Sequence, residues 1–391
     1  MKRVVITGMG VVSCLGNSVE EMWARLIRGE SGLSEMSRWD ASALRNARMG
    51  EVKDFPWDDE HDEASQFALF ATGQALAQSG LADGHGLALV SATNFAGASS
   101  WESYLSCLHA GLIDAETAEL FREFCYGRAA ELLCERYHFA GPKRVLSLSC
   151  SSGTAALGQA MDLIRLGKAP AALCEGHDSL AFSSMAGLSI LRTITNEEIR
   201  PFDARRSGTI FGEGAAALVL EDLDHAVARG ATIFAEVLGY AANNNAFHLT
   251  APDKEGEGLV AVLQETMRDA GVAGAEIDYI NAHGTGTSYF DVTETRAVKT
   301  VLGARAYQIP MSSIKPAVGH MMAAAGAVEA IATVCAMRDG IAPPTLHLEQ
   351  PDPACDLDYV PAQARACAMR TALSISSGIG GNNAAVALRR Y

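Results

Sequence analysis

The sequence contains no paired cysteine motif. Its nine cysteines, an odd number, are scattered over 391 residues without any CxxC pair. Paired spacings of this kind build zinc knuckles, and an even set of cysteines is typical of small secreted proteins held together by disulfide bonds. Neither class is indicated. We therefore expect a protein of the reducing cytoplasm whose cysteines remain free thiols.

Positive charge and long apolar runs are also scarce. The chain has 31 Lys and Arg against 46 Asp and Glu, a net charge of −15, and no run of basic residues. Nucleic acids and anionic membranes attract concentrated positive charge, so neither is an expected partner. No apolar run approaches the roughly 18 residues of a membrane span. The N-terminal MKRVVITGMGVVSCLG begins as a signal peptide does, but glycines interrupt it, and we interpret it as a buried strand and turn.

Exact repeats and low-complexity tracts are absent, and strand-like runs alternate with helical segments instead. The strand-like runs are 4–8, 87–91, 144–149, 216–221 and 278–283. The helical segments are 18–27, 64–79, 258–270 and 323–340. This alternation predicts an α/β fold with buried sheets. A composition shift near 226–233 predicts two halves, 1–225 and 226–391.

Cys150 lies between two of these patterns. The strand-like RVLSLS precedes it, and apolar residues at 156, 160, 163 and 164 follow the spacing of one buried helical face. A helix that begins just after Cys150 directs unpaired backbone N–H groups and the positive end of its dipole at the thiol, which favours the thiolate. The small residues of CSSG allow a substrate carbonyl to approach the sulfur. The alternative is a small apolar residue that fills a turn.

Two histidines stand at the ends of other strand-like runs. His283 belongs to INAHGTGTSYFD at 280–291, and His320 to SSIKPAVGHMMAAAGAVEA at 312–330, together with Lys315. A cysteine with two histidines allows a hydrolase, in which a histidine deprotonates the thiol. It also allows formation of a carbon–carbon bond, in which the cysteine holds an acyl group and the imidazoles donate hydrogen bonds to an enolate. A metal site ranks last because the close ligand spacings of zinc motifs are missing, and no metal is expected.

With these segments in view, the whole chain resembles the elongating β-ketoacyl-acyl carrier protein synthases, the condensing enzymes of fatty acid and polyketide synthesis. The likeness runs from VVITGMGVVSCLGNS to SSGIGGNNAAVAL and includes RPFDARRSGTIFGEGAAALVLE at 200–221 and AFHLTAPDKEGEG at 246–258. The resemblance implies a thiolase-like α/β fold in which two similar halves form a five-layered α/β/α/β/α sandwich. It places the nucleophile in the N-terminal half and both histidines in the C-terminal half.

The resemblance also implies roles for individual residues. Cys150 is the acyl-accepting nucleophile, and its oxyanion hole is assigned to the backbone N–H groups of Cys150 and Ile379. His283 and His320 face the malonyl group, and Lys315 supports them. The residues implied to bind substrate are Thr285, Thr287, Arg206, Ile379 and Gly380, and the supporting carboxylates are Asp291 and Glu329. Arg205 and Arg206 are the expected basic surface for an acidic carrier protein.

The reaction that the resemblance implies is a decarboxylative Claisen condensation. Cys150 takes an acyl chain from the phosphopantetheine arm of an acyl carrier protein, and malonyl-carrier then extends it to a 3-oxoacyl chain. No bound cofactor is expected beyond that arm. The expected assembly is a homodimer or a heterodimer with a ketosynthase-like subunit. In the second case the chain is the catalytic partner of a chain-length-factor-like subunit in a type II polyketide pathway.

Two other functions fit the resemblance less well. A thiolase needs a second cysteine near its C-terminal glycine loop, and residues 374–385 contain none. A non-catalytic partner subunit typically lacks the nucleophile, whereas Cys150 is present. Both functions are therefore disfavoured against the condensing enzyme.

The sequence departs from the family pattern at two places. Ile379 stands where a phenylalanine of a GFGG stretch is usual, and its side chain is smaller and stiffer, so we expect different gating of the acyl and malonyl groups. Ser288, Tyr289 and Phe290 replace a proline and small residues. We expect these rings either to narrow the pantetheine entrance or to pack at an interface. Both departures favour a secondary-metabolite ketosynthase.

Overall fold

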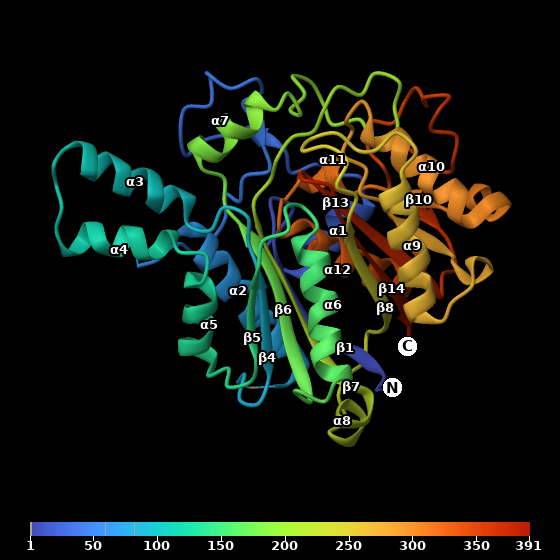
Figure 1. The fold of residues 1–391 in the computed structure, drawn as a ribbon, viewed down its shortest axis with the longest axis horizontal. Coiled ribbons are helices and arrows are strands. Elements are labelled where there is room, and N and C mark those ends of the chain that lie inside the picture. The colour runs from blue at the N-terminus through green and yellow to red at the C-terminus, as the bar shows by residue number, and fades with distance from the viewer. Residues whose placement is uncertain (1, 59, 82) are drawn as a thin grey trace.

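The computed structural model describes residues 2–58, 60–81 and 83–391 (Figure 1). Its main sheet has ten strands in the order β10-β9-β13-β14-β8-β1-β7-β6-β4-β5. At the centre, β1 (Val4–Val12) pairs with β8 (Ala235–Asn244) over three residues, Val4 to Ile6. All of β1 is buried, so the interpretation of the N-terminal segment as a buried strand is confirmed.

The sheet consists of two halves with one repeated pattern. The strands of the first half are β1, β4 (Ala88–Ala92), β5 (Lys143–Leu146), β6 (Ala171–Asp178) and β7 (Gly214–Asp222). Those of the second half are β8, β9 (Tyr279–Asn281), β10 (Met311–Ser312), β13 (Thr371–Gly378) and β14 (Asn382–Arg390). The two halves pair their strands in the same way when the strands are counted in chain order within each half. The fifth strand pairs antiparallel with both the first and the fourth. The second strand lies between the fourth and the third and is parallel to both. The expected α/β fold of two similar halves is confirmed.

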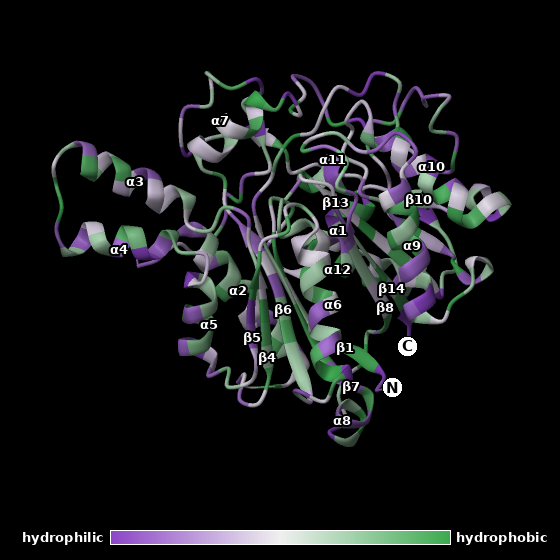
Figure 2. Cartoon of the chain, in the orientation of Figure 1, coloured by the Kyte–Doolittle hydropathy of each residue, from purple (hydrophilic) through white to green (hydrophobic). Residues whose placement is uncertain are grey.

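Two central helices are sandwiched between the halves. Helix α6 (Ser152–Arg165) follows β5, and α12 (Ala325–Asp339) follows β10, the equivalent strand of the second half. They contact each other and strands of both halves. Every residue of α12 from Ala325 to Met337 is buried, as expected for a helix that is apolar all round. Strand β4 and the first half of β6, on which α6 packs, are likewise hydrophobic (Figure 2).

The outer helices cover the sheet from its other faces. Helices α2 (Glu63–Ser79) and α5 (Arg128–Tyr137) cover the first half, and α9 (Glu257–Ala270) and α10 (Phe290–Leu302) cover the second (Figure 1). The remaining helices are α1 (Val19–Ile27), α3 (Ala98–His109), α4 (Ala115–Phe124), α7 (Phe182–Ile190), α8 (Leu223–Ala228), α11 (Lys315–Val318), η1 (Gly274–Glu276) and η2 (Gly303–Gln308). Two small sheets pair β2 (Ser34–Glu35) with β3 (Arg48–Met49), and β11 (Ile341–Ala342) with β12 (Arg365–Ala366). Over the described ranges, none of the helices has the length and apolarity to cross a bilayer.

Most predicted elements end close to the observed ones, but two strands differ: β1 continues to Val12, whereas the predicted strand ended at residue 8. Strand β5 ends at Leu146, whereas the strand-like run continues to residue 149. Ser149 has a φ of 55°, a left-handed conformation that a strand does not accommodate. The chain therefore leaves the sheet before Cys150 and turns directly into α6.

The two central helices approach most closely at a glycine near the start of each. A Cβ on Gly153 of α6 would lie 2.6 Å from the carbonyl oxygen of Ala323 and 2.9 Å from the nitrogen of Ala327. A Cβ on Gly326 of α12 would lie 2.5 Å from the nitrogen of Thr154. These contacts involve backbone atoms, which cannot move without shifting a helix. Because glycine has no side chain, these two positions allow the N-termini of the two helices to pack in direct backbone contact.

The variant Gly153→Ala tests this contact. The added methyl group overpacks the helix crossing, and we expect the free energy of unfolding to fall by about 2 kcal/mol or more. Gly187→Ala is the matched control, because Gly187 lies within exposed helix α7 and an added Cβ meets nothing within 4 Å. That change should leave stability unchanged or raise it by up to about 1 kcal/mol. Denaturant titration of wild type and both variants gives their free energies of unfolding. A Gly153→Ala protein as stable as Gly187→Ala would contradict a tight contact at Gly153.

Candidate active site

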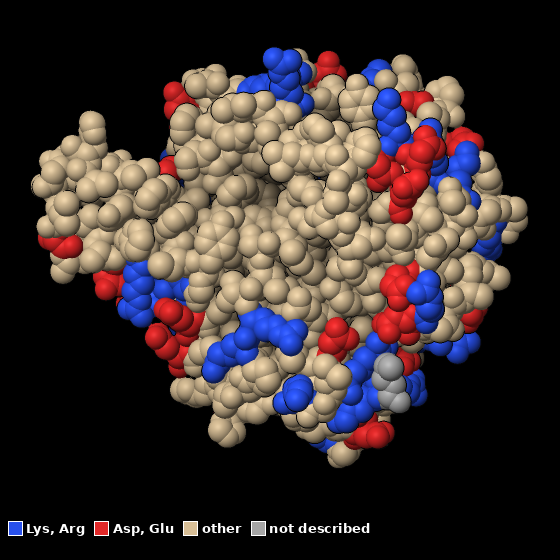
Figure 3. Space-filling model, in the orientation of Figure 1, with Lys and Arg blue, Asp and Glu red and all other residues tan. Residues whose placement is uncertain are grey.

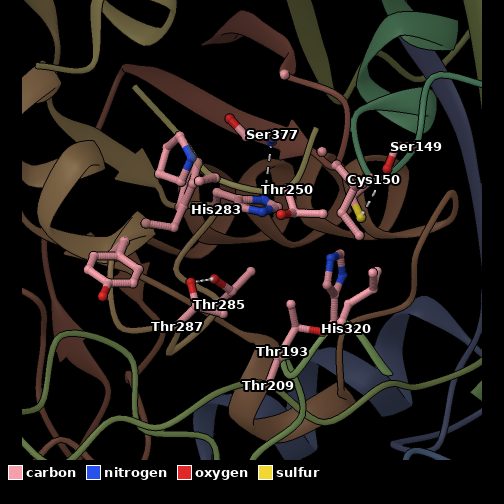
Figure 4. A pocket seen from close by; sticks show the side chains of 18 of the residues that line it. Ser149, Cys150, Thr193, Thr209, Thr250, His283, Thr285, Thr287, His320 and Ser377 are labelled. Atoms are coloured by element: carbon pink, nitrogen blue, oxygen red, sulfur yellow. Dashed lines mark hydrogen bonds between the residues drawn. The ribbon is translucent and has the colours of Figure 1, made fainter. Parts of the chain in front are cut away.

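A cavity of about 610 Å³ contains Cys150, His283 and His320. Leu188 of α7 and Leu259 of α9 lie on its wall, and the face of the molecule between these helices is hollowed at its centre (Figure 3). Charged side chains lie mainly around the edge of that face (Figure 3). The three residues selected from separate sequence segments therefore share one chamber (Figure 4).

Cys150 sits in the turn between β5 and α6. Its side chain is 8% exposed, and the Ser152 N–H donates to the carbonyl of Ser149 to close the turn. Strand β13 approaches so closely that a Cβ on Gly378 would lie 2.8 Å from the nitrogen of Cys150. Glycine at 378 thus allows the loop that contains Ile379 to reach the thiol.

Opposing effects act on the Cys150 thiol. Burial raises its pKa above the ordinary value, whereas hydrogen bonds from the Ser149 hydroxyl and the backbone of Ile379, and the positive charge of Lys315, lower it. The Ser149 oxygen lies 3.7 Å from the sulfur. The N-terminus of α6 also favours the thiolate through its dipole. The protein therefore surrounds a buried sulfur with groups that stabilise its negative form.

The imidazole of His283 is fixed by its backbone and by its ring. The N–H groups of His283 and Gly284 donate to the Glu294 carboxylate at 2.7 and 2.9 Å. The Ser377 N–H donates to Nδ1 of His283 at 3.3 Å, so Nδ1 is an acceptor and the proton of the neutral ring lies on Nε2. Phe290 packs against the ring, with centroids 4.8 Å apart. One N–H donor is thus held in a defined orientation.

His320 is held by the segment just before β7. Its backbone N–H donates to the carbonyl of Ile210, and its carbonyl accepts from the Gly212 N–H. Its ring stacks on Phe211, with centroids 5.5 Å apart. The rings of His283 and His320 are also 5.5 Å apart and nearly perpendicular, at 85°. Two imidazoles at this spacing can both donate a hydrogen bond to the same oxygen atom of a substrate.

Burial and a nearby buried cation together keep this pair of imidazoles neutral. Lys315 is fully buried, and its ammonium donates to the His283 carbonyl at 2.5 Å and to the Glu329 carboxylate. Burial lowers the pKa of both imidazoles well below the ordinary value, and the charge of Lys315 lowers each further. Both rings are therefore neutral near pH 7 and act as hydrogen-bond donors rather than as acids.

The expected substrate-binding residues are only partly gathered in the cavity. Thr285, Thr287 and Ile379 line it, and the two threonine hydroxyls are 3.0 Å apart. Gly380 belongs to the same loop as Ile379 but does not line the cavity. Arg206 lies behind the threonine loop, where it donates to the carbonyls of Thr287 and Ser288. Its position there indicates support of the loop rather than contact with substrate.

The expected basic docking surface is already neutralised within the chain. The Arg206 guanidinium pairs with Asp352 at 2.6 Å, and its side chain is 7% exposed. Arg205 pairs with Asp203 and Glu349 at 3.0 and 2.7 Å. An arginine that is paired in this way has little charge to offer a carrier protein. These two residues are therefore poor candidates for the docking surface.

The two expected supporting carboxylates differ in what they hold. Glu329 pairs with Lys315, as expected for a carboxylate that neutralises the lysine. Asp291 instead accepts from the backbone N–H groups of Phe202 and Gly286, at 2.8 and 3.1 Å, and so holds the loop of Thr285 and Thr287. Burial raises the pKa of Asp291 to about 6.

Sequence reasoning missed two buried carboxylates of the site. Glu294 holds the backbone of His283, and its position three residues after Asp291 on the following helix was the available signal. Asp178 accepts from the N–H groups of Asn94 and Phe95 and from that of Ala323, at 2.9, 2.9 and 2.8 Å. Asp178 therefore ties the loop after β4 to the loop that follows His320.

The aromatic departures lie in different surroundings. Tyr289 lines the cavity with 77% of its surface exposed, so the cavity extends to the molecular surface beside it. Phe290 also lines the cavity and packs on the ring of His283. Met161 and Phe182 do not line the cavity: Met161 lies in the core, and Phe182 packs on Trp39.

Family models match most of the chain. The model of the beta-ketoacyl synthase N-terminal domain matches residues 1–226, and that of the C-terminal domain matches residues 234–349. The chain is 37% identical over 414 residues to 3-oxoacyl-acyl-carrier-protein synthase 2 of Coxiella burnetii, with 100% of this chain and 99% of the relative covered.

Two solved structures share the fold over the whole chain. One is a type II polyketide synthase acyl-carrier protein in complex with its ketosynthase bound to the hexaketide; it has a TM-score of 0.94 at 32% identity and covers 100% of this chain and 99% of that chain. The other is the ishigamide ketosynthase/chain length factor, with a TM-score of 0.93 at 35% identity and the same coverage. The expected thiolase-like ketosynthase fold is confirmed.

The variant Ser149→Ala tests the hydrogen bond to the sulfur. Without the hydroxyl the pKa of Cys150 rises further, and we expect alkylation of the thiol by iodoacetamide at pH 7 to slow about five-fold. The mass of the peptide that contains Cys150, followed against time over a range of pH, gives the rate and the pKa, because the other eight cysteines are also free thiols. Ser147→Ala, also on the cavity wall, is the control and should react at the wild-type rate. An unchanged pH profile in Ser149→Ala would contradict the role of this hydroxyl.

The protonation of the imidazoles is measurable by NMR of ¹³C-labelled histidine. An ordinary histidine goes from about 3% to about 76% protonated between pH 8 and pH 6. We expect the signals of His283 and His320, assigned with His→Gln variants, to stay unshifted over this range. Because their pKa values are lowered on folding, the unfolded chain binds more protons below pH 6.5, so these residues make stability fall as the pH drops. Titration of either signal near pH 6.5 would show a charged imidazole.

Proposed function

The chain belongs to the beta-ketoacyl synthase family, and from this premise we propose how its cavity carries out the reaction. The protein is an acyltransferase that condenses an enzyme-bound acyl thioester with malonyl-acyl carrier protein. The products are a 3-oxoacyl-carrier and CO₂. The observation that carries the assignment of residues is that a thiol beside a helix N-terminus and two neutral imidazoles share one cavity.

Cys150 performs the first step. Its thiolate attacks the thioester carbonyl of the acyl-carrier, the new C–S bond forms, the C–S bond to the carrier breaks, and the carrier leaves as a thiolate that takes a proton from solvent. The N–H groups of Cys150 and Ile379 stabilise the oxyanion. The short distance between Gly378 and the nitrogen of Cys150 supports this pairing of donors.

The imidazoles act in the second step. The Nε2–H of His283 and the ring of His320 donate to the thioester carbonyl of malonyl-carrier. Cleavage of the bond to the carboxyl carbon releases CO₂ and leaves the electron pair in an enolate that these donors stabilise. Neutral rings suit this task because they stabilise developing charge without protonating the carbanion.

Carbon–carbon bond formation completes the cycle. C2 of the enolate attacks the Cys150 thioester, the C–S bond breaks, and Cys150 leaves as the thiolate that the next cycle requires. Lys315 keeps its ammonium on the His283 carbonyl throughout and positions that loop. Glu329 balances the lysine charge, and Asp291 holds the threonine loop.

The carrier protein is the partner that delivers both substrates. Its phosphopantetheine arm enters beside Tyr289 and passes Thr285 and Thr287, whose hydroxyls suit the amides of the arm. The chain itself needs no bound cofactor in this scheme. The 1–225 half contributes Cys150, and the 226–391 half contributes both histidines.

A catalytic role within a heterodimer is the second candidate. The ishigamide ketosynthase/chain length factor, 35% identical to this chain, favours it. In that arrangement the present chain supplies Cys150, and a chain-length-factor-like subunit completes the dimer. Co-expression with such a subunit distinguishes this assembly from a homodimer by the mass of the complex.

Intact mass spectrometry tests the condensation. The chain incubated with acyl-carrier should gain one acyl group, lose it when malonyl-carrier is added, and release a 3-oxoacyl product two carbons longer. Cys150→Ala should gain none, whereas Cys174→Ala, at a buried core cysteine, should behave as wild type. Acylation that persists in Cys150→Ala would reject the nucleophile.

The variant His320→Ala separates the two half-reactions. Removal of one donor to the enolate should slow condensation by about 100- to 1000-fold, while acylation of Cys150 continues. Single-turnover kinetics of the pre-acylated enzyme measure condensation, and intact mass measures acylation. His85→Ala, in an exposed turn, is the control. A His320→Ala protein that stays unacylated would contradict this division of roles.

A further inference from the structure

Two hydroxyl groups on the cavity wall have no hydrogen-bond partner among the described residues. They are the buried Oγ1 atoms of Thr193 and Thr209, and Thr209 as a whole is only 2% exposed. Other hydroxyls of the wall are paired within the protein: Thr285 with Thr287, Ser377 with Asn383, and Ser207 with Thr195. A buried hydroxyl without a partner costs free energy, and a ligand that binds it recovers that cost.

The backbone places these two threonines together. The Thr209 N–H donates to the carbonyl of Thr193 at 2.8 Å, which aligns the two segments side by side. Thr209 stands two residues before Phe211, so both side chains lie on the same face of an extended segment. Phe211 stacks on His320. The Thr209 side chain therefore lies on the cavity wall beside the imidazole of His320, with its hydroxyl oxygen buried.

The threonine pair is separated from the nucleophile. Figure 4 shows His320 between Cys150 and the side chains of Thr193 and Thr209. A group attached to the acyl chain on Cys150 lies on the sulfur's side of His320. A group attached to the second substrate, whose carbonyl the imidazoles bind, lies within reach of the threonines. The position thus favours the extender unit over the acyl chain.

The distinguishing group of the extender unit is its carboxylate. One carbon separates it from the thioester carbonyl, so a site that recognises it has to lie beside the imidazoles. Two hydroxyl donors are suited to this task, because they orient a carboxylate without the strong stabilisation that an ammonium or guanidinium provides. Strong stabilisation of the carboxylate in the ground state would oppose the loss of CO₂.

We propose that Thr193 and Thr209 form a hydroxyl subsite that binds the carboxylate of the malonyl extender unit and orients its scissile bond. This inference rests on the proposed function, since it takes the thioester carbonyl to lie at His283 and His320. Thr209 is the principal donor, because it is the more buried of the two and lies next to the residue that stacks on His320. Both residues are positioned by hydrogen bonds between segments that are 16 positions apart in the sequence.

The subsite is tested by comparing the affinities of two ligands for two proteins, wild type and Thr209→Val, in a thermodynamic cycle. Malonyl-pantetheine and acetyl-pantetheine differ by the carboxylate, and Thr209→Val removes the hydroxyl while the side chain keeps its shape. We expect wild type to bind the malonyl ligand more tightly than the acetyl ligand, and Thr209→Val to lose about ten-fold of this preference. Thr193→Val should lose part of it. Calorimetric titration of both ligands, as amide analogues that do not acylate Cys150, gives the four affinities.

Controls separate this result from misfolding and from failure of the proposed function. Thr266→Val removes a buried hydroxyl outside the cavity and should retain the preference. Acylation of Cys150 by acyl-carrier, measured by intact mass, should proceed within two-fold of wild type in both cavity variants. Acylation that fails in wild type itself would count against the proposed function, while the affinity cycle would still report on the subsite.

Three outcomes would contradict the proposal that Thr193 and Thr209 bind the malonyl carboxylate. Equal losses of malonyl and acetyl binding in Thr209→Val would assign the hydroxyl to the pantetheine arm. A retained malonyl preference would show that the carboxylate binds elsewhere. A selective loss of 3-hydroxyacyl transfer to Cys150, with malonyl binding unchanged, would assign the threonines to the acyl chain.

Discussion

The buried ion pair of Lys315 and Glu329 is the interaction on which the rest of the cavity depends. A fully buried ammonium needs an opposite charge and further acceptors, because its removal from water is costly. Glu329 supplies the charge from α12, and the carbonyl of His283 supplies an acceptor. The same ammonium lowers the pKa of Cys150, His283 and His320. One buried cation thereby sets the position of a loop and the protonation of the groups around it.

Because the two halves repeat one fold, equivalent positions in each half contribute the residues of this one cavity. Cys150 lies between β5 and α6, and His320 lies between β10 and α12, which are equivalent positions of the two halves. Because α6 and α12 cross at glycines near their starts, both turns open on the same cavity. Glu329 also connects to α6 through Ser376, whose hydroxyl bonds that of Thr154 at 2.7 Å. The nucleophile and the imidazoles are therefore held on one rigid assembly.

Residues with a local signature were the ones that sequence reasoning found. Cys150 and His283 each stand shortly after a strand, His320 follows helix α11, and all three lie beside small residues and line the cavity. Asp178 has no such signature, because its partners come from the loop at 93–95 and from residue 323. Arg206 was expected at the cavity, yet its pairing with Asp352, 146 residues away, holds it behind the threonine loop. Long-range pairing of this kind leaves no local pattern.

The sequence by itself determined the alternation of strands and helices and the helix that begins after the thiol, because these follow from the spacing of apolar residues and glycines along a short stretch of chain. The similarity of the two halves was implied by the family resemblance. Only the tertiary structure decided which polar groups are satisfied. The neutral state of the imidazoles depends on their burial and on the charge of Lys315, and the hydroxyls of Thr193 and Thr209 stay unpaired because the folded wall places no partner beside them among the described residues. Burial and hydrogen-bond pairing are properties of segments brought together by packing, and the order of residues along the chain does not specify them.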